Sequence, residues 1–118
     1  MGFVYHGHYA AFYEIGRTEA LRSLGITYKE VEAAGVIMPV VEIHTKFIRP
    51  AKYDDLLTVV TKIIEMPIHH KIVFHGEIFN ENNELLNTGT VTLFFMTSKT
   101  MKRCAMPDLM QEKVKEFF

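Results

Sequence analysis

The chain has 118 residues, 48% of them hydrophobic, and a formal net charge of −1. The length fits one domain, 1–118, and the hydrophobic fraction excludes global disorder. With 13 basic and 14 acidic side chains there is no basic stripe, so we expect no nucleic-acid partner. Charges and prolines interrupt every apolar run, so we expect no membrane span. The single cysteine, Cys104, cannot form an internal disulfide, which favours a reducing, cytoplasmic setting.

A long helix is predicted over residues 8–24. Apolar and small residues recur there at helical spacing: Tyr9, Phe12, Gly16, Ala20 and Leu24. Small residues let another backbone approach closely, which is typical of a helix enclosed by a sheet. Gly25 would end this helix. A short second helix is predicted over Tyr28–Ala34, with Thr27 and Glu30 forming a capping box and Gly35 as its end.

From Val36 the apolar periodicity changes to two, which predicts strands. In the first strand one face carries Val41, Ile43, Thr45 and Phe47, and the other carries Glu42, His44 and Lys46. Further strands are predicted at 57–63, 72–78 and 86–96, with a hairpin turn at Asn80–Asn83 and a final helix from Pro107. Helices followed by strands, without βα alternation, predict an α+β fold in which one antiparallel sheet curves around the long helix.

Motifs for metal binding or nucleophilic catalysis are missing from the sequence. His6 and His8, or His69 and His70, have no further ligands at useful spacing, so we expect no metal site. Phosphate-binding glycine loops and the GxSxG pattern are absent. Cys104 lies among basic residues, but no cysteine–histidine motif accompanies it, and we expect it to be incidental.

The start of the long helix is the remaining candidate site. Gly2 and Gly7 bracket the apolar and aromatic segment Phe3–His6. The first amides of a helix have no partners within it, and together with the helix dipole they can polarise a carbonyl oxygen. The alternative is an ordinary helix start whose side chains pack on the sheet.

Four segments resemble the hotdog-fold acyl-CoA thioesterases, in particular the 4-hydroxybenzoyl-CoA thioesterase and YbgC-like group. They are Met1–Tyr9 (MGFVYHGHY), Phe12–Glu19 (FYEIGRTE), Leu21–Tyr28 (LRSLGITY) and Phe47–Leu57 (FIRPAKYDDLL). The resemblance covers nearly the whole chain. It implies a hotdog fold, a curved antiparallel sheet wrapped around one long helix, and hydrolysis of an acyl or aromatic acyl thioester.

The same resemblance assigns the parts of a catalytic site. The family's catalytic Asp lies three positions before the glycine that matches Gly2, which falls upstream of Met1. We therefore expect the sequence to begin inside a longer gene product, with the Asp and a first strand upstream. The backbone N–H of His6 matches the family's oxyanion donor, and Gly7 permits close approach. The His6 side chain would either orient water or line the pocket, and His8 stands where the family often has Asn.

Other residues receive roles with alternatives. Glu14 is a reserve catalytic carboxylate, because another hotdog branch uses a helix carboxylate, but it could instead pair with Arg17 one turn on. Arg49 would bind the phosphates of coenzyme A or be an exposed strand-end residue. Substrate-lining positions are Tyr5, Gly7, Tyr9, Tyr13 and Met38, with core packing favoured for Phe12.

The resemblance also implies partners. The coenzyme A moiety would arrive as part of the acyl-CoA substrate, with no separate cofactor, and the chain would form a homodimer or homotetramer. A non-catalytic acyl-thioester-binding hotdog domain is the alternative function. A dehydratase or hydratase on this fold needs a His with a second acid in its own motif, which the sequence lacks.

Overall fold

The long N-terminal helix and the sheet beneath it form the frame of the molecule. The computed structural model describes residues 6–52, 56–67 and 69–116, without the side chains of residues 6–10. The helices are α1 (His6–Ser23), α2 (Tyr28–Ala33) and α3 (Asp108–Lys115). The strands are β1 (Val36–Ile37), β2 (Val40–Phe47), β3 (Thr58–Lys62), β4 (Lys71–Phe79), β5 (Leu85–Phe94) and β6 (Met96–Thr97).

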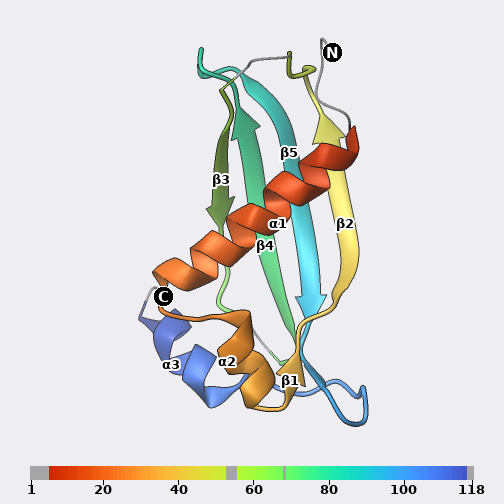
Figure 1. Cartoon of the computed structure of the whole chain (residues 1–118), viewed down its shortest axis with the longest axis vertical. Helices are drawn as coiled ribbons and strands as arrows, with labels where there is room; N and C mark the ends of the chain where they lie inside the picture. Colours follow the sequence, from red (N-terminus) through yellow and green to blue (C-terminus); the bar gives the residue numbers. More distant parts are fainter. Residues whose placement is uncertain (1–5, 53–55, 68, 117–118) are drawn as a thin grey trace.

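The main sheet is antiparallel, with strand order β2-β5-β4-β3. The consecutive strands β3, β4 and β5 form a meander, and β2 pairs with the other edge of β5. A separate two-stranded ribbon pairs β1 with β6. Figure 1 shows α1 crossing one face of the sheet diagonally, which agrees with the expected α+β architecture. Within the residues that the structure describes, β2 and β3 are the two edge strands of the main sheet.

Alternation along the strands separates a helix side from an outer side. On β4 the helix side carries Ile72, Phe74, Gly76 and Ile78, each buried, whereas the residues between them are partly exposed. The register places Ile43, Thr45 and Phe47 of β2 on that same side, as the sequence predicted. His75 lies on the outer side, opposite Thr90.

The larger hydrophobic core lies at the end of the sheet where the C-terminal half of α1 meets the other helices. Leu21, Ile26 and Val31 pack with Met110 and Val114 of α3, all at most 1% exposed. The α3 ammonium of Lys113 donates to the carbonyl of Gly25, at 2.5 Å, just beyond the C-terminus of α1. A cation there stabilises the negative end of the helix dipole.

No helix in the described ranges has the length and apolar character that a membrane crossing requires.

Most predicted boundaries agree with the structure within two residues. The capping box is present, because the Thr27 side chain accepts a hydrogen bond from the backbone N–H of Glu30. Gly25 and Gly35 have φ values of +80° and +82°, as residues that end helices often do. The β4–β5 turn is held by the Asn80 side chain, which accepts from the N–H groups of Asn82 and Glu84.

Candidate active site

The helical backbone of α1 begins at His6. Its first N–H groups, those of His6 to Tyr9, therefore have no carbonyl four residues earlier within the helix. In Figure 1 this end of α1 projects over β2. Tyr5, and the side chains of His6, His8 and Tyr9, lie outside what the structure describes. The backbone at Gly7 is helical, and the unpaired amides at the start of a helix are able to bind a carbonyl oxygen.

Tyr13 lies between α1 and the sheet and is 4% exposed. Its ring covers two glycines that face each other in the register, Gly76 of β4 and Gly89 of β5. A Cβ on Gly76 would meet the ring at under 3.0 Å, so a side chain at position 76 would displace Tyr13. The sequence predicted Tyr13 as a substrate-lining residue, and the structure places it on the sheet-facing side of α1.

The Tyr13 hydroxyl donates to Oδ1 of Asn87, at 2.5 Å. Asn87 is fully buried, and among the described residues its Nδ2 has no hydrogen-bond partner. Sequence reasoning missed Asn87. The β4–β5 register shifts between Ile78 and Phe79, so both Leu86 and Asn87 are buried and simple alternation fails there. The burial of Asn87 depends on that irregularity, which no local pattern in the sequence marks.

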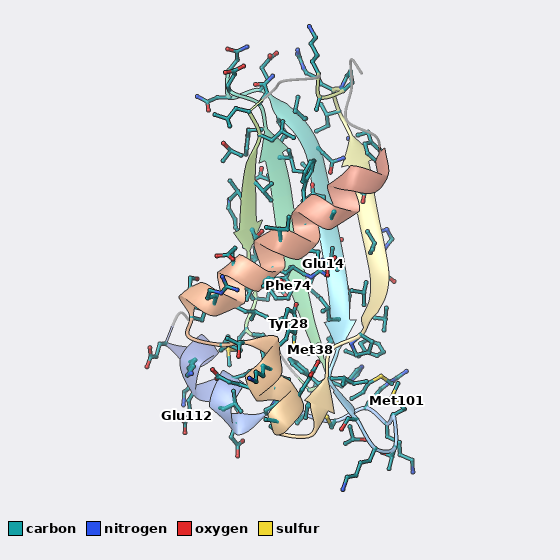
Figure 2. The ribbon with its side chains drawn as sticks, in the orientation of Figure 1. Glu14, Tyr28, Met38, Phe74, Met101 and Glu112 are labelled. Carbon is teal, nitrogen blue, oxygen red and sulfur yellow. The ribbon has the colours of Figure 1, made fainter. Side chains whose placement is uncertain are left out.

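Glu14 and Arg17 do not form the ion pair that their spacing allows. Glu14 is exposed, and none of the ion pairs between described residues joins it to Arg17. Figure 2 shows Glu14 on α1, over β5. Arg17 is only 8% exposed, and its Nε is buried with no partner among the described residues. The predicted structural role of Glu14 as the counter-ion of Arg17 is therefore wrong, because the two side chains leave α1 on different faces.

The remaining predicted residues lie at opposite ends of β2. Met38 precedes the strand and packs, half-buried, against the larger core (Figure 2). Arg49 follows it and donates to a carboxylate oxygen of Glu84, at 2.7 Å, with 62% of its side chain exposed. An eight-residue strand is about 25 Å long, so the structure does not bring Met38 and Arg49 together.

The outer face of the sheet carries a shallow depression of about 520 Å³. Its polar lining includes His44, Lys46, Lys62, His75, Glu77, Thr88 and Thr90. Two of the nitrogen-bearing side chains there already have partners, since Lys62 Nζ lies 3.4 Å from a carboxylate oxygen of Glu77 and His44 Nε2 lies 2.8 Å from one of Glu42. Within the described ranges, no three His, Cys, Asp or Glu side chains are grouped so that they could hold a metal ion.

The sequence and fold match known thioesterases. Residues 1–87 match the family model described as thioesterase superfamily. The chain is 36% identical over 106 residues to acyl-CoA thioester hydrolase YbgC of Escherichia coli O157:H7, covering 90% of this chain and 78% of that protein. It is 33% identical to the putative acyl-CoA thioesterase YneP of Bacillus subtilis, covering 92% of this chain and 80% of that protein. The crystal structure of DHNA-CoA thioesterase from Staphylococcus aureus superposes with a TM-score of 0.89 at 30% identity, covering 99% of this chain and 80% of that one.

Proposed function

The chain belongs to the thioesterase superfamily and is an acyl-CoA thioester hydrolase, and from that premise we propose that hydrolysis takes place at the N-terminal end of α1. The observation that carries the proposal is the start of α1 at His6, which leaves the first amides available to a carbonyl oxygen. We take the His6 N–H as the principal donor, with Gly7 allowing close approach. The acyl group and the thioester carbonyl are the substrate's reacting part, and coenzyme A is its leaving group.

The reaction replaces a carbon–sulfur bond with a carbon–oxygen bond. A carboxylate, expected upstream of Met1, either removes a proton from the attacking water or attacks the carbonyl carbon itself. Negative charge then develops on the carbonyl oxygen, and the α1 amides stabilise it because they point at that position before the reaction begins. Collapse of the tetrahedral intermediate expels the thiolate of coenzyme A, which takes up a proton. When water is the nucleophile, the free carboxylic acid is left. When the carboxylate is the nucleophile, a mixed anhydride is left, and water hydrolyses it to the free acid and restores the carboxylate.

Several side chains complete this proposal. Tyr5, Tyr9, Tyr13 and Met38 would line the acyl pocket, and the His6 side chain would orient water or line it too. Glu14 remains the reserve carboxylate, since it is exposed on α1 and unpaired among the described ion pairs. Arg49 would bind a phosphate of coenzyme A in exchange for Glu84. We place the reaction in the cytoplasm, in keeping with the unpaired Cys104.

We also propose that β2 pairs with β2 of a second copy of the chain. All eight residues of β2 are exposed, on both faces of the strand. Val40, Val41, Ile43, Phe47 and Ile48 are between 42% and 50% exposed. A long apolar edge strand is a template for pairing with another strand, and antiparallel pairing with itself generates a two-fold dimer. Such a dimer would place a second copy beside the exposed residues on the helix side of β2.

Replacing His6 tests the amide donor directly. His6→Pro removes the N–H, and proline is tolerated at the first position of a helix, which is where His6 lies. His6→Ala keeps the N–H and removes only the imidazole. In the full-length protein, thiol release from acetyl-, hexanoyl- and benzoyl-CoA should fall by about a hundredfold or more in His6→Pro relative to His6→Ala. Equal rates in two variants of unchanged helical content would refute the amide as donor.

Thiol-release and binding assays on the wild-type protein distinguish a hydrolase from a binding module. We expect thiol release that is lost when the upstream Asp is replaced by Asn. Tight binding of acyl-CoA thioethers, together with no turnover of any thioester in the panel, would overturn the proposed hydrolysis and favour the non-catalytic acyl-thioester-binding domain.

A further inference from the structure

The backbone of β2 directs alternate residues toward β5 and toward the open edge of the sheet. Ile48, directly after the strand, donates its N–H to the carbonyl of Leu86, at 2.9 Å. Successive residues of a strand direct their N–H and C=O groups to opposite sides, so Lys46 and His44 also face β5. Ile43 and Thr45 therefore direct theirs to the edge at which the described structure has no further strand.

The side chains of β2 form a pattern that is complementary to itself. The outer side carries Glu42, His44 and Lys46, and all three are exposed. A carboxylate oxygen of Glu42 lies 2.8 Å from Nε2 of His44, whereas Lys46 belongs to none of the ion pairs between described residues. An acid and a base at equal distances on either side of a central residue match a second, antiparallel copy of the same strand.

We propose that β2 pairs with β2 of a second copy in one register, with His44 on the two-fold axis and each Glu42 opposite the partner's Lys46. The inference rests on the proposed function, which includes the pairing of the two strands. A slip by one residue would set outer residues against residues of the helix side, which a shared sheet does not allow. Sliding one strand by two residues keeps the faces, but it sets His44 opposite the partner's Lys46 in one direction and Lys46 opposite the partner's Val40 in the other.

The same register satisfies the backbone of the open edge. Ile43 of each copy lies opposite the partner's Thr45, and residues in such a position exchange both N–H to C=O hydrogen bonds. The outer residues then form the pairs without direct hydrogen bonds, in which side chains approach most closely. Opposite charges at these positions stabilise the pairing, and the dimer contains the Glu42 and Lys46 pair twice.

This register also brings parts of the proposed active site together from two copies. α1 begins over the C-terminal part of β2, and Arg49 follows that end (Figure 1). Because the two strands run antiparallel, the partner's β2 begins at the same place. Continuing the register beyond the strand sets the partner's Met38 opposite Pro50, next to Arg49. Each site would thus take the α1 amides and Arg49 from one copy and Met38 from the other.

Disulfide cross-linking of the full-length protein tests the register. In a Cys104→Ser background, His44→Cys should form an intersubunit disulfide, because the two Cα atoms would lie about 4.5 Å apart across the axis. Ile43→Cys and Thr45→Cys are the matched controls, since two copies of either cysteine would lie about 9 Å apart, beyond the reach of a disulfide. Cross-linking at position 43 or 45 instead of 44 would overturn the register and leave the dimer standing. A monomer in light scattering would overturn both, while thiol release judges the hydrolysis separately.

Charge reversal tests the pairing of acid and base. Glu42→Lys and Lys46→Glu should each raise the dissociation constant of the dimer about tenfold, because each turns two attractive pairs into repulsive ones. The double variant should return to within about threefold of wild type. Glu81→Lys changes the net charge equally at an exposed turn position and should have no effect. A double variant as weak as the single ones would overturn the proposed pairing.

Mixed dimers test the contribution of the partner to the site. His6→Pro and Met38→Lys dimers should each release little thiol. After subunit exchange in an equal mixture, half of the dimers would be heterodimers, and each would contain one site with both residues intact. Thiol release should then recover to about a quarter of the wild-type rate. A fully active Met38→Lys dimer, or heterodimers without recovery, would overturn the partner's contribution, while the cross-linking result would still decide the register.

Discussion

Substituting Gly76 by alanine tests how α1 is fixed on the sheet. A methyl group at position 76 would point to the helix side and approach Cε1 and Cδ1 of Tyr13 at under 3.0 Å. The ring cannot stay where it is, so its hydroxyl must leave Asn87. Overpacking of this kind costs about 1–3 kcal/mol, and leaving a buried carboxamide unpaired costs about as much again. Alanine also lowers the conformational entropy of the unfolded chain, which offsets about 0.4–1 kcal/mol of this loss of stability.

The net expectation for Gly76→Ala is a loss of about 3 kcal/mol in the free energy of unfolding. That corresponds to a fall in Tm of roughly 10–20 °C for a domain of this size. Urea unfolding followed by circular dichroism measures this loss, at a fixed protein concentration because the proposed dimerisation would add to stability.

Gly89→Ala is the matched control, since Gly89 lies directly opposite Gly76 in the register. Its added Cβ would lie 3.2 Å both from the backbone oxygen of His44 and from the nearest Tyr13 atom. These contacts need shifts of only a few tenths of an ångström, so the loss should stay smaller, at about 1 kcal/mol. In a Tyr13→Leu background, Gly76→Ala should cost under about 1 kcal/mol, which gives a coupling of roughly 2 kcal/mol. Equal losses for the two glycine variants, or a Gly76→Ala cost that persists without the tyrosine, would refute the reasoning.

Three further substitutions probe other parts of the structure. Tyr13→Phe removes the hydroxyl that donates to Asn87 and should lower the free energy of unfolding by about 1–2 kcal/mol. A loss below about 0.5 kcal/mol in urea unfolding would show that this hydrogen bond contributes little to stability. Ile43→Glu should convert the proposed dimer to a monomer, as measured by light scattering, because it places a charge on the exposed helix side of β2. The more exposed Ile64→Glu should leave the oligomeric state unchanged. Met110→Ala should lower stability by about 2–5 kcal/mol in the same unfolding assay, since Met110 is fully buried, and a smaller loss would mean that α3 contributes little to the core.

The fold followed from local signals in the sequence, and its exceptions have physical causes. The capping box of α2 and the alternation of β2 are encoded within a few residues, and both agree with the structure. The β1–β6 ribbon escaped prediction because each strand has two residues, and Val36 pairs with Thr97 far along the chain. Strands that short carry no periodicity of their own.

The candidate site was less predictable than the fold. Helical spacing allowed Glu14 to pair with Arg17, but spacing alone does not say which face of α1 the sheet will bury. Burial of Tyr13 and Leu21 orients the helix so that Arg17 lies inside and Glu14 outside. Asn87 was hidden by the irregularity in the β4–β5 register. The burial of Arg17 and the burial of Asn87 depend on contacts between segments far apart in the sequence, so the sequence alone could not predict them.

The strand order also has a consequence for synthesis on the ribosome. β2 ends at Phe47, and its partner β5 begins at Leu85. At a translation rate of about 5–20 residues per second, the apolar β2 emerges several seconds before the strand that pairs with it. During that interval its backbone groups are unpaired, which is the state in which nascent chains associate wrongly. The strand that we propose to pair with a second copy is thus also a segment of the growing chain that a chaperone would protect from wrong association.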